Sequence, residues 1–249
     1  MKSLRKFFPA TSLFISLISL WEFSVQTKLV SFHLLPAPSQ IIIALITNWD
    51  VIGQHTLQTC IEAVLGLVLS IILGFLVAVF LDMSSTTRKA VYPLLVTSQT
   101  IPMLALAPLL LLWFGFDITP KVFIVLLSCF FPITIATLDG FAHIDRDYTK
   151  LLQSMRASYW QTLWYLKLPG SLPQFFSGLK IAATYSVTGA VVGEYVGAYQ
   201  GLGIYMQEVA HSHIIALVFA VIFVISIVSL LLVGGVIIAE WLLLPWRRI

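Results

Sequence analysis

Six long apolar stretches constrain this chain more than any other feature of its sequence. A helix needs about 20 apolar residues, each rising about 1.5 Å, to cross the roughly 30 Å hydrocarbon core of a bilayer. The six stretches run from Phe7 to Val25, Thr59 to Leu81, Val91 to Phe114, Val122 to Leu138, Phe175 to Tyr199 and Ile214 to Leu244. They predict an all-α, polytopic membrane protein with six transmembrane helices. We expect a single transmembrane domain over residues 1–249, with its core in residues 55–245.

The charge content supports the same conclusion. Of the 249 residues, 59% are hydrophobic and 10% are charged, whereas a soluble domain carries about 25% charged residues. So few charges cannot cover the surface of a water-soluble globule, and the exterior must face the lipid bilayer. A soluble enzyme and a nucleic-acid-binding protein are thereby excluded. The two cysteines, Cys60 and Cys129, lie within apolar runs and indicate neither a disulfide framework nor a metal site.

The distribution of basic residues predicts the orientation in the membrane. Of the 14 lysines and arginines, only Lys28 and Lys121 fall on one side of the predicted bilayer, and the other twelve fall on the opposite side. Because cytoplasmic segments are rich in Lys and Arg, we expect a multi-pass protein of the cell membrane with both termini in the cytoplasm. The first stretch follows basic residues, as a signal peptide does, but no small-residue cleavage pattern comes after it. We interpret it as an uncleaved span.

The third stretch contains helix-breaking and polar residues. Proline lacks a backbone donor and clashes with the preceding turn, so Pro93, Pro102 and Pro108 predict a kinked helix. Such breaks are tolerated in a membrane where protein or a water-filled cavity satisfies the backbone, which predicts a position inside the bundle. Gln99 and Thr100 add polar groups just before the second proline. They either line a transport path or bond to neighbouring helices.

The fifth stretch combines a glycine stripe with a carboxylate. Gly189, Gly193 and Gly197 are four residues apart, share one helical face and predict close helix packing. Glu194 lies beside them, and an ionisable group at membrane depth is costly unless it is paired or faces water. Two interpretations stay open. Glu194 is either a residue of the path or gate, or a carboxylate near the outer interface that bonds to a neighbouring helix.

The longest polar segment lies between the fourth and fifth stretches, at residues 139–173, and it has helical character. Ser158 and Gln161 have the spacing of a capping box. A short helix is expected to follow and to end at Leu168, because the residue before proline is biased out of the helical conformation and Pro169 comes next. Segments of this length with internal structure are commonly functional.

Two tryptophans give this short helix an aromatic face. Trp160 and Trp164 are four residues apart, as are Tyr159 and Leu163, so each pair shares a face. The tryptophans either anchor in the lipid headgroups or dock in a groove of a cytoplasmic partner.

The segment from Lys150 to Pro169, KLLQSMRASYWQTLWYLKLP, resembles the cytoplasmic EAA loop of binding-protein-dependent ABC importer permeases. That loop reads Glu-Ala-Ala, three residues, Gly, nine residues, Ile-x-Leu-Pro. Aligned on Pro169, the end of the pattern matches, while Lys150 stands at the glutamate and Arg156 at the glycine. Since that glycine supplies a permissive turn between two helices, Arg156 is the departure that bears on the loop geometry.

The resemblance extends over nearly the whole chain. The blocks LLPAPSQI (34–41), IPMLALAPLLLLWFG (101–115) and GEYVGAYQGLGIYM (193–206) are similar to permeases of the taurine, sulfonate and nitrate type. CFFPITIATLDGF (129–141) and SGLKIAATYSVTGAVVGEY (177–195) look most like permeases for the pyrimidine precursor of thiamine.

The resemblance implies the partners and the division of labour. Two copies of the chain would pair as a homodimer around one path, a cytoplasmic ATPase dimer would drive it, and an extracellular or periplasmic binding protein would deliver the substrate. The chain has no phosphate-binding loop, so ATP and magnesium would sit on the ATPase and this chain would hold no cofactor or catalytic residue. The residues implied in coupling are Lys150, Arg156, Ala157, Ser158, Trp160, Trp164, Leu168 and Pro169.

The implied substrate is a small heteroaromatic compound of the hydroxymethylpyrimidine type. The third stretch has no basic residue, and in the fifth the only one, Lys180, lies near the cytoplasmic end. The candidates for lining the path are neutral or aromatic apart from one carboxylate: Gln99, Thr100, Pro102, Tyr185, Ser186, Glu194 and Tyr195. An aliphatic sulfonate, taurine or a nitrate-like anion is the alternative substrate class. An ion-coupled carrier is a more remote alternative, and an intramembrane enzyme lacks any matching residue set.

Overall fold

The computed structural model of the protein describes residues 4–29 and 34–245, with the side chains of its first helix described from Ser12 onward except for Phe14. Every regular element within these residues is a helix, as the sequence predicts. The elements are α1 (Leu4–Gln26), α2 (Pro38–Thr47), α3 (Trp49–Asp82), α4 (Ser85–Ser98), α5 (Met103–Phe114), α6 (Ile118–Ala142), α7 (Arg146–Ser154), α8 (Tyr159–Thr162), the π-helical turn η1 (Leu163–Lys167), α9 (Leu168–Gly197), α10 (Leu202–His211) and α11 (Ile215–Leu243).

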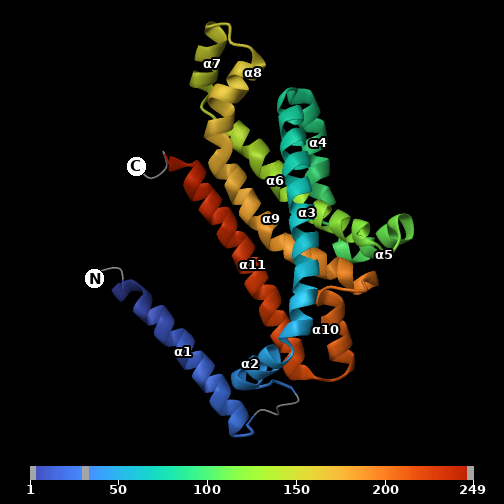
Figure 1. Ribbon diagram of the computed structural model, residues 1–249. Helices are drawn as coiled ribbons and strands as arrows, with labels where there is room; N and C mark the ends of the chain where they lie inside the picture. The colour runs from blue at the N-terminus through green and yellow to red at the C-terminus, as the bar shows by residue number, and fades with distance from the viewer. Residues whose placement is uncertain (1–3, 30–33, 246–249) are drawn as a thin grey trace.

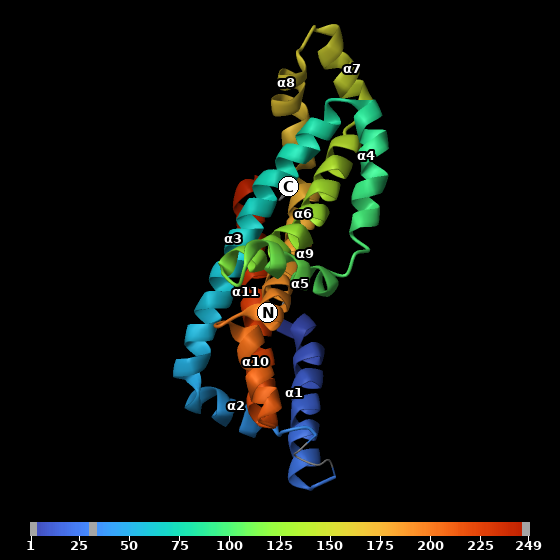
Figure 2. The same cartoon turned by 90° about the vertical axis from the view of Figure 1, so that its right-hand side faces the viewer.

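The centre of the bundle is the pair α6 and α9. α3 packs along α6 and α11 packs along α9, as Figures 1 and 2 show from two directions. α7 and α8 project from one end of the bundle, whereas α2 and α10 lie at the opposite end. α1 lies beside α2, where the Glu22 carboxylate accepts hydrogen bonds from the Ser39 amide at 3.0 Å and the Ser39 hydroxyl at 2.7 Å.

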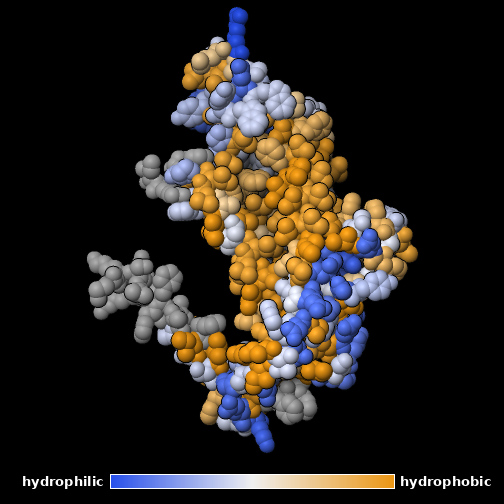
Figure 3. Space-filling model, in the orientation of Figure 1, coloured by the Kyte–Doolittle hydropathy of each residue, from blue (hydrophilic) through white to orange (hydrophobic). Residues whose placement is uncertain are grey.

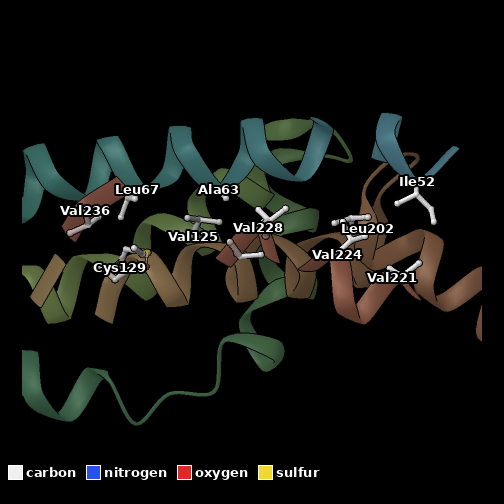
Figure 4. Packing of buried hydrophobic residues seen from close by; sticks show 14 of the residues in the cluster. Ile52, Ala63, Leu67, Val125, Cys129, Leu202, Val221, Val224, Val228 and Val236 are labelled. Atoms are coloured by element: carbon white, nitrogen blue, oxygen red, sulfur yellow. Dashed lines mark hydrogen bonds between the residues drawn. The ribbon is translucent and has the colours of Figure 1, made fainter. Parts of the chain in front are cut away.

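Small and β-branched residues fill the core. In lipid there is little hydrophobic drive to bring helices together, so close packing of small residues carries much of the association. Ala63 of α3 and Ala182, Ala183 and Ala190 of α9 are completely buried. Where α9 crosses α6, a side chain at Gly178 would meet the carbonyl oxygen of Pro132. Figure 4 shows the resulting contact layer, which α3, α6 and α11 share.

An apolar belt covers the outside of the bundle. Large side chains such as Phe80, Leu76 and Ile238 are more than half exposed. Polar side chains gather at the two ends of the molecule, and the apolar surface lies between them (Figure 3). This is the surface expected of a chain whose middle lies in hydrocarbon.

The count of six spans is not established by the described residues. Four helical segments are long and apolar enough to cross a bilayer, or five if the bent pair α4 and α5 forms one span. The first predicted span coincides with α1, part of whose side chains lie outside the description. The second predicted span starts too late, because the helix extends back from Thr59 to Trp49.

The predicted third span is two helices and not one kinked helix. α4 and α5 are separate helices that bend by 97° at Gln99–Pro102. Pro102 is extended and forms the N-cap of α5, so it begins a helix where the prediction had only a kink. α5 buries Ala107, Leu110 and Leu111, whereas α4 buries only Leu95. Both halves therefore contact the bundle, α5 with more buried residues and α4 through Leu95 and a hydrogen bond from Arg88 to the Leu138 carbonyl of α6.

The prediction that Pro169 ends the short cytoplasmic helix is also wrong. α8, η1 and α9 form one continuous helical segment from Tyr159 to Gly197. In η1 the amide of Leu168 bonds to the carbonyl of Leu163, five residues back, which widens the turn just before the proline. A wider turn relieves the clash between a proline ring and the preceding turn, so the helix continues. The predicted polar segment, residues 139–173, is accordingly shortened at both ends by α6 and α9.

Candidate functional site

A hollow of about 320 Å³ lies where the α4–α5 bend meets α6 and α9. Its lining, within the described part of the chain, is uncharged: Gln99, Ile101, Met103, Ser128, Phe131, Pro132, Tyr185, Thr188, Gly189 and Val192. The break before α5 creates this hollow's wall, because it brings both Gln99 and Met103 to face α6. A weakly polar space of this size between membrane helices fits a small molecule.

Two of the lining polar groups are free to bond a ligand. The hydroxyl of Ser128 donates to the carbonyl of Ile124 at 2.8 Å, and the hydroxyl of Thr188 donates to the carbonyl of Thr184 at 3.4 Å. The Gln99 amide and the Tyr185 hydroxyl make no hydrogen bond to any residue that the structure describes, and Tyr185 is half exposed. An amide and a phenol can together donate and accept, which suits a neutral polar molecule.

The other candidates for the path lie elsewhere. Thr100 is exposed and its hydroxyl donates to the Thr97 carbonyl at 2.7 Å. Ser186 is buried and bonds to the Ala183 carbonyl at 2.9 Å. Tyr195 contacts the sulfur of Met206 at 3.7 Å. Ser128 and Phe131 of α6 were not predicted, and the serine inside the fourth apolar stretch was their only signal in the sequence.

Glu194 is completely buried and caps the start of α10. One of its carboxylate oxygens accepts from the Gly203 amide at 2.5 Å, and the other accepts from the Thr59 hydroxyl at 2.6 Å. Thr59 in turn accepts from the Leu202 amide at 2.9 Å, and His55 Nδ1 accepts from the Gly201 amide at 3.0 Å. The first amides of a helix have no partner within it, and a carboxylate there also meets the positive end of the helix dipole.

Gly201 and Gly203 permit this arrangement. Gly201 has φ of +132°, a conformation that other residues rarely adopt, and a side chain at either position would collide with the Glu194 carboxylate. The role of His55 and Thr59 on α3 was not predicted. Their spacing of four residues places both on one face, but nothing in the sequence pairs that face with α10.

A second buried carboxylate lies beside this cluster. Glu62, one turn along α3 from Thr59, is completely buried and accepts from the side-chain amide of Gln58 at 2.8 Å. The Lys121 ammonium of α6, itself buried, lies 3.9 Å from the Glu62 carboxylate. Lys121 lies in the first turn of α6, one residue before the predicted start of the fourth span at Val122. A buried charge needs such a counterion.

The glycine stripe of α9 lies against α6 and the turn before it. A side chain at Gly189 would meet Val125 and Ser128, and one at Gly193 would meet Lys121. At Gly197 a side chain would meet Phe116 and Leu111. The stripe therefore lets α9 approach α6 along the wall of the hollow and up to the buried ion pair.

The projecting segment begins with a strained turn between α7 and α8. Arg156 has φ of +57°, in the left-handed region. Its amide donates to the Gln153 carbonyl at 2.9 Å and the Ala157 amide donates to the Leu152 carbonyl at 3.0 Å, which is the bonding pattern of a Schellman motif. Arg156 thus adopts the conformation that the glycine of the family pattern would favour, at a steric cost that glycine avoids.

The helical turns of α8 and η1 have one face on their own bundle and one exposed face. Ser158 and Gln161 form the predicted capping box, with bonds of 3.3 and 2.7 Å. Leu163 is buried beneath the end of α3, whereas Trp160 and Trp164 are 54% and 63% exposed. Lys150 of α7 pairs with Asp147 at 3.1 Å, but both side chains are largely exposed and such a pair contributes little.

An all-helical bundle with an apolar belt, an uncharged hollow and a helical projection at one end has the architecture expected of a membrane transport subunit. Residues 66–243 match the family described as "binding-protein-dependent transport system inner membrane component", and the chain belongs to this family. Its members are permease components of ABC importers. They work with a separate ATPase and a substrate-binding protein, so this chain is not itself the catalyst.

Individual relatives cover nearly the full chain. The formylaminopyrimidine transport permease protein ThiX of Halalkalibacterium halodurans is 39% identical, over 96% of this chain and 95% of that protein. The taurine transport system permease protein TauC of Escherichia coli is 30% identical, over 93% and 86%. Among solved structures, an inward-facing MetNI methionine ABC transporter chain has a TM-score of 0.68 at 15% identity, over 78% of this chain and 97% of that chain. The last likeness concerns the fold alone.

Proposed function

We propose that this permease imports a small aminopyrimidine precursor of thiamine, of the hydroxymethylpyrimidine type, by alternating access. The uncharged hollow carries this proposal. A fixed anion such as a sulfonate would favour a basic side chain or a helix N-terminus aimed at it, and the described lining offers an amide, a phenol and aromatic surface instead. The likeness to a formylaminopyrimidine permease supports the same choice.

Each group of the hollow has a task in this proposal. Phe131 and Tyr185 present aromatic rings on which a flat heterocycle can stack. The Gln99 amide can match an amino group and a ring nitrogen with one acceptor and one donor. The substrate-binding protein would supply most of the selectivity. The hollow would be polar enough to admit the ring but would bind it only weakly.

The homodimer completes the path. In this proposal two copies face each other across their hollows, and two ATPases bind the projecting helices, where Trp160 and Trp164 offer an aromatic face. ATP and magnesium belong to those ATPases. Both termini lie in the cytoplasm, and the substrate-binding protein docks on the end that carries α2 and α10.

Uptake in cells tests the substrate. Labelled hydroxymethylpyrimidine should accumulate in cells that cannot make it when this chain is expressed with its ATPase and binding protein, and not when the chain is left out. Labelled taurine is the parallel arm, because a taurine permease is among the relatives. Accumulation of taurine without any of the pyrimidine would overturn the proposed substrate and leave the permease assignment intact.

A further inference from the structure

Asp82 ties the projecting helix to a second helix of the bundle. We propose that it is a positioning residue, through which a movement of the ATPase-docking helix is passed to α3 as well as to α9. The proposal rests on the proposed function in one respect, namely that α8 is the segment that binds the ATPase. It concerns how the motion is divided within this chain, a question on which the substrate has no bearing.

The Asp82 carboxylate is the hub of a half-buried polar cluster. It is the last residue of α3, and one of its oxygens accepts from the Lys167 ammonium at 2.6 Å and from the Tyr159 hydroxyl at 3.1 Å. The exposed fractions of the Asp82 and Lys167 side chains are 6% and 17%. The Lys167 ammonium also lies 5.6 Å from the centre of the Tyr159 ring. Hydrogen bonds between charged groups with this little solvent are stronger than those of exposed pairs.

The cluster joins parts of the chain that are far apart in sequence. Lys167 and Tyr159 lie 85 and 77 residues after Asp82. Both belong to the continuous helical segment that ends as α9, so any push on α8 reaches α9 through the helix itself. α3 has no such covalent route. Its polar connections to the projection are the Asp82 carboxylate and the Val79 carbonyl, which accepts from the Tyr159 hydroxyl at 3.3 Å. The buried Leu163 beside Ala78 and Val79 supports them.

The far end of α3 carries the second contact that this proposal needs. Over 34 residues α3 is about 50 Å long. At its other end His55 and Thr59 hold the start of α10 and the Glu194 carboxylate. One unbroken helix therefore has the docking projection fastened at one end and the α10 cluster fastened at the other. If α3 moves with the projection, the opposite end of the molecule moves too.

The test uses the complex of this chain with its ATPase and binding protein in proteoliposomes. Three quantities are measured for each variant: ATPase association, ATP hydrolysis and the amount of substrate moved per ATP. Asp82→Asn keeps the shape and removes the charge. We expect association and hydrolysis to persist, and the amount of substrate moved per ATP to fall severalfold, because the variant weakens the charge-assisted hydrogen bonds that hold α3 to the projection.

The matched control removes another ion pair between two helices, one that does not involve α3 or the projection. Lys180 of α9 pairs with Glu240 of α11 at 2.5 Å, and Glu240→Gln should leave the amount moved per ATP unchanged. The exchange Asp82→Lys with Lys167→Asp restores a pair of reversed polarity and should recover most of the loss. If Asp82→Asn does not fold, Tyr159→Phe removes one of the two bonds to Asp82, together with the bond to the Val79 carbonyl, and leaves the ion pair of Asp82 with Lys167 in place. A smaller fall in the same ratio is then expected.

Two results would overturn the proposal. One is an unchanged amount moved per ATP in both Asp82→Asn and Tyr159→Phe. The other is loss of ATPase association in Asp82→Asn, because Asp82 would then shape the docking surface and not the transmission. The proposed docking is tested separately with a double variant, Trp160→Ala with Trp164→Ala. If that variant still binds the ATPase, the docking proposal fails, whatever the result for Asp82.

Discussion

The hydroxyl of Thr59 donates to the carboxylate of Glu194 at 2.6 Å, and this bond joins α3 to α9 across the buried interior. Thr59 is used twice, since its oxygen also accepts from the Leu202 amide of α10. Three helices therefore meet at two side chains that are both completely buried. In a membrane no water can replace a lost partner in such a cluster, so the loss of one hydrogen bond leaves a buried polar group unsatisfied.

Thr59→Val should destabilise the protein. Valine keeps the shape of threonine but leaves the Leu202 amide without its acceptor and removes one of the two donors to Glu194. A buried group left unsatisfied costs about 1–3 kcal/mol. We expect a lower unfolding midpoint in detergent for Thr59→Val and a midpoint close to that of the native protein for Thr59→Ser. Equal midpoints for all three proteins would contradict the assigned bonds.

Glu194→Gln should impair transport modestly without changing its pH dependence. The amide oxygen can still accept from Gly203, and Thr59 can then turn its hydroxyl to the His55 carbonyl, which lies 3.1 Å away. Most of the capping of α10 is thereby retained. Uptake measured across a pH series checks this expectation. A variant that abolishes a proton-driven uptake would favour the ion-coupled carrier over the ATP-driven permease.

The elements of this fold were largely predictable, and their long-range pairs were not. Hydropathy located α6 and α11 to within a few residues at most ends, because length and apolar content define a spanning helix. The 97° break at Pro102 was read as a kink, since a proline marks a possible break without setting its size. Periodicity within α3 and α9 carries no information about which faces meet. The bonds of Asp82 with Lys167 and of Thr59 with Glu194 therefore emerged only from the structure.

The glycine stripe and Arg156 are two further features that the sequence predicted only in part. Spacing predicted a close approach along Gly189 and Gly193, but not that the approach is to α6 at Lys121. Comparison with the family pattern predicted that Arg156 departs from a glycine. The comparison did not predict whether the turn would change or whether Arg156 would adopt the left-handed conformation of the glycine. In the structure Arg156 adopts that conformation and the turn is kept.

Arg156→Gly should stabilise the end of α7. A left-handed conformation costs a residue other than glycine about 1–2 kcal/mol. Glycine avoids this steric cost but loses more conformational entropy on folding, so the net stabilisation is smaller. The last amides of α7 should therefore exchange their hydrogens more slowly in Arg156→Gly than in the native protein. Arg156→Ala removes the same charge but keeps the side-chain clash, and it should show no such protection. Faster exchange in the glycine variant would contradict the strained turn.

The orientation can be tested with two exposed positions at opposite ends of the molecule. Arg156 lies in the α7–α8 turn and His211 at the end of α10, and both side chains are exposed. The basic residues predict that the first is cytoplasmic and the second is outside. Single cysteines placed there, in a chain without Cys60 and Cys129, should react with an impermeant thiol reagent on intact cells at position 211 only. Labelling at position 156 would reverse the topology.

The exposed aromatic face of α8 and η1 is expected to bind the ATPase. Trp160 and Trp164 are more than half exposed although Tyr159 and Leu163 of the same turns are tied to the bundle, so truncating the tryptophans removes outward surface without unpacking the helix. An aromatic anchor in a protein groove commonly costs about 2 kcal/mol or more on truncation. Trp160→Ala and Trp164→Ala should each insert normally and retain less ATPase on copurification. Phe223→Ala, which truncates an exposed aromatic residue on α11, is the matched control and should retain all of it. Undiminished ATPase with both tryptophan variants would assign this face to the lipid headgroups.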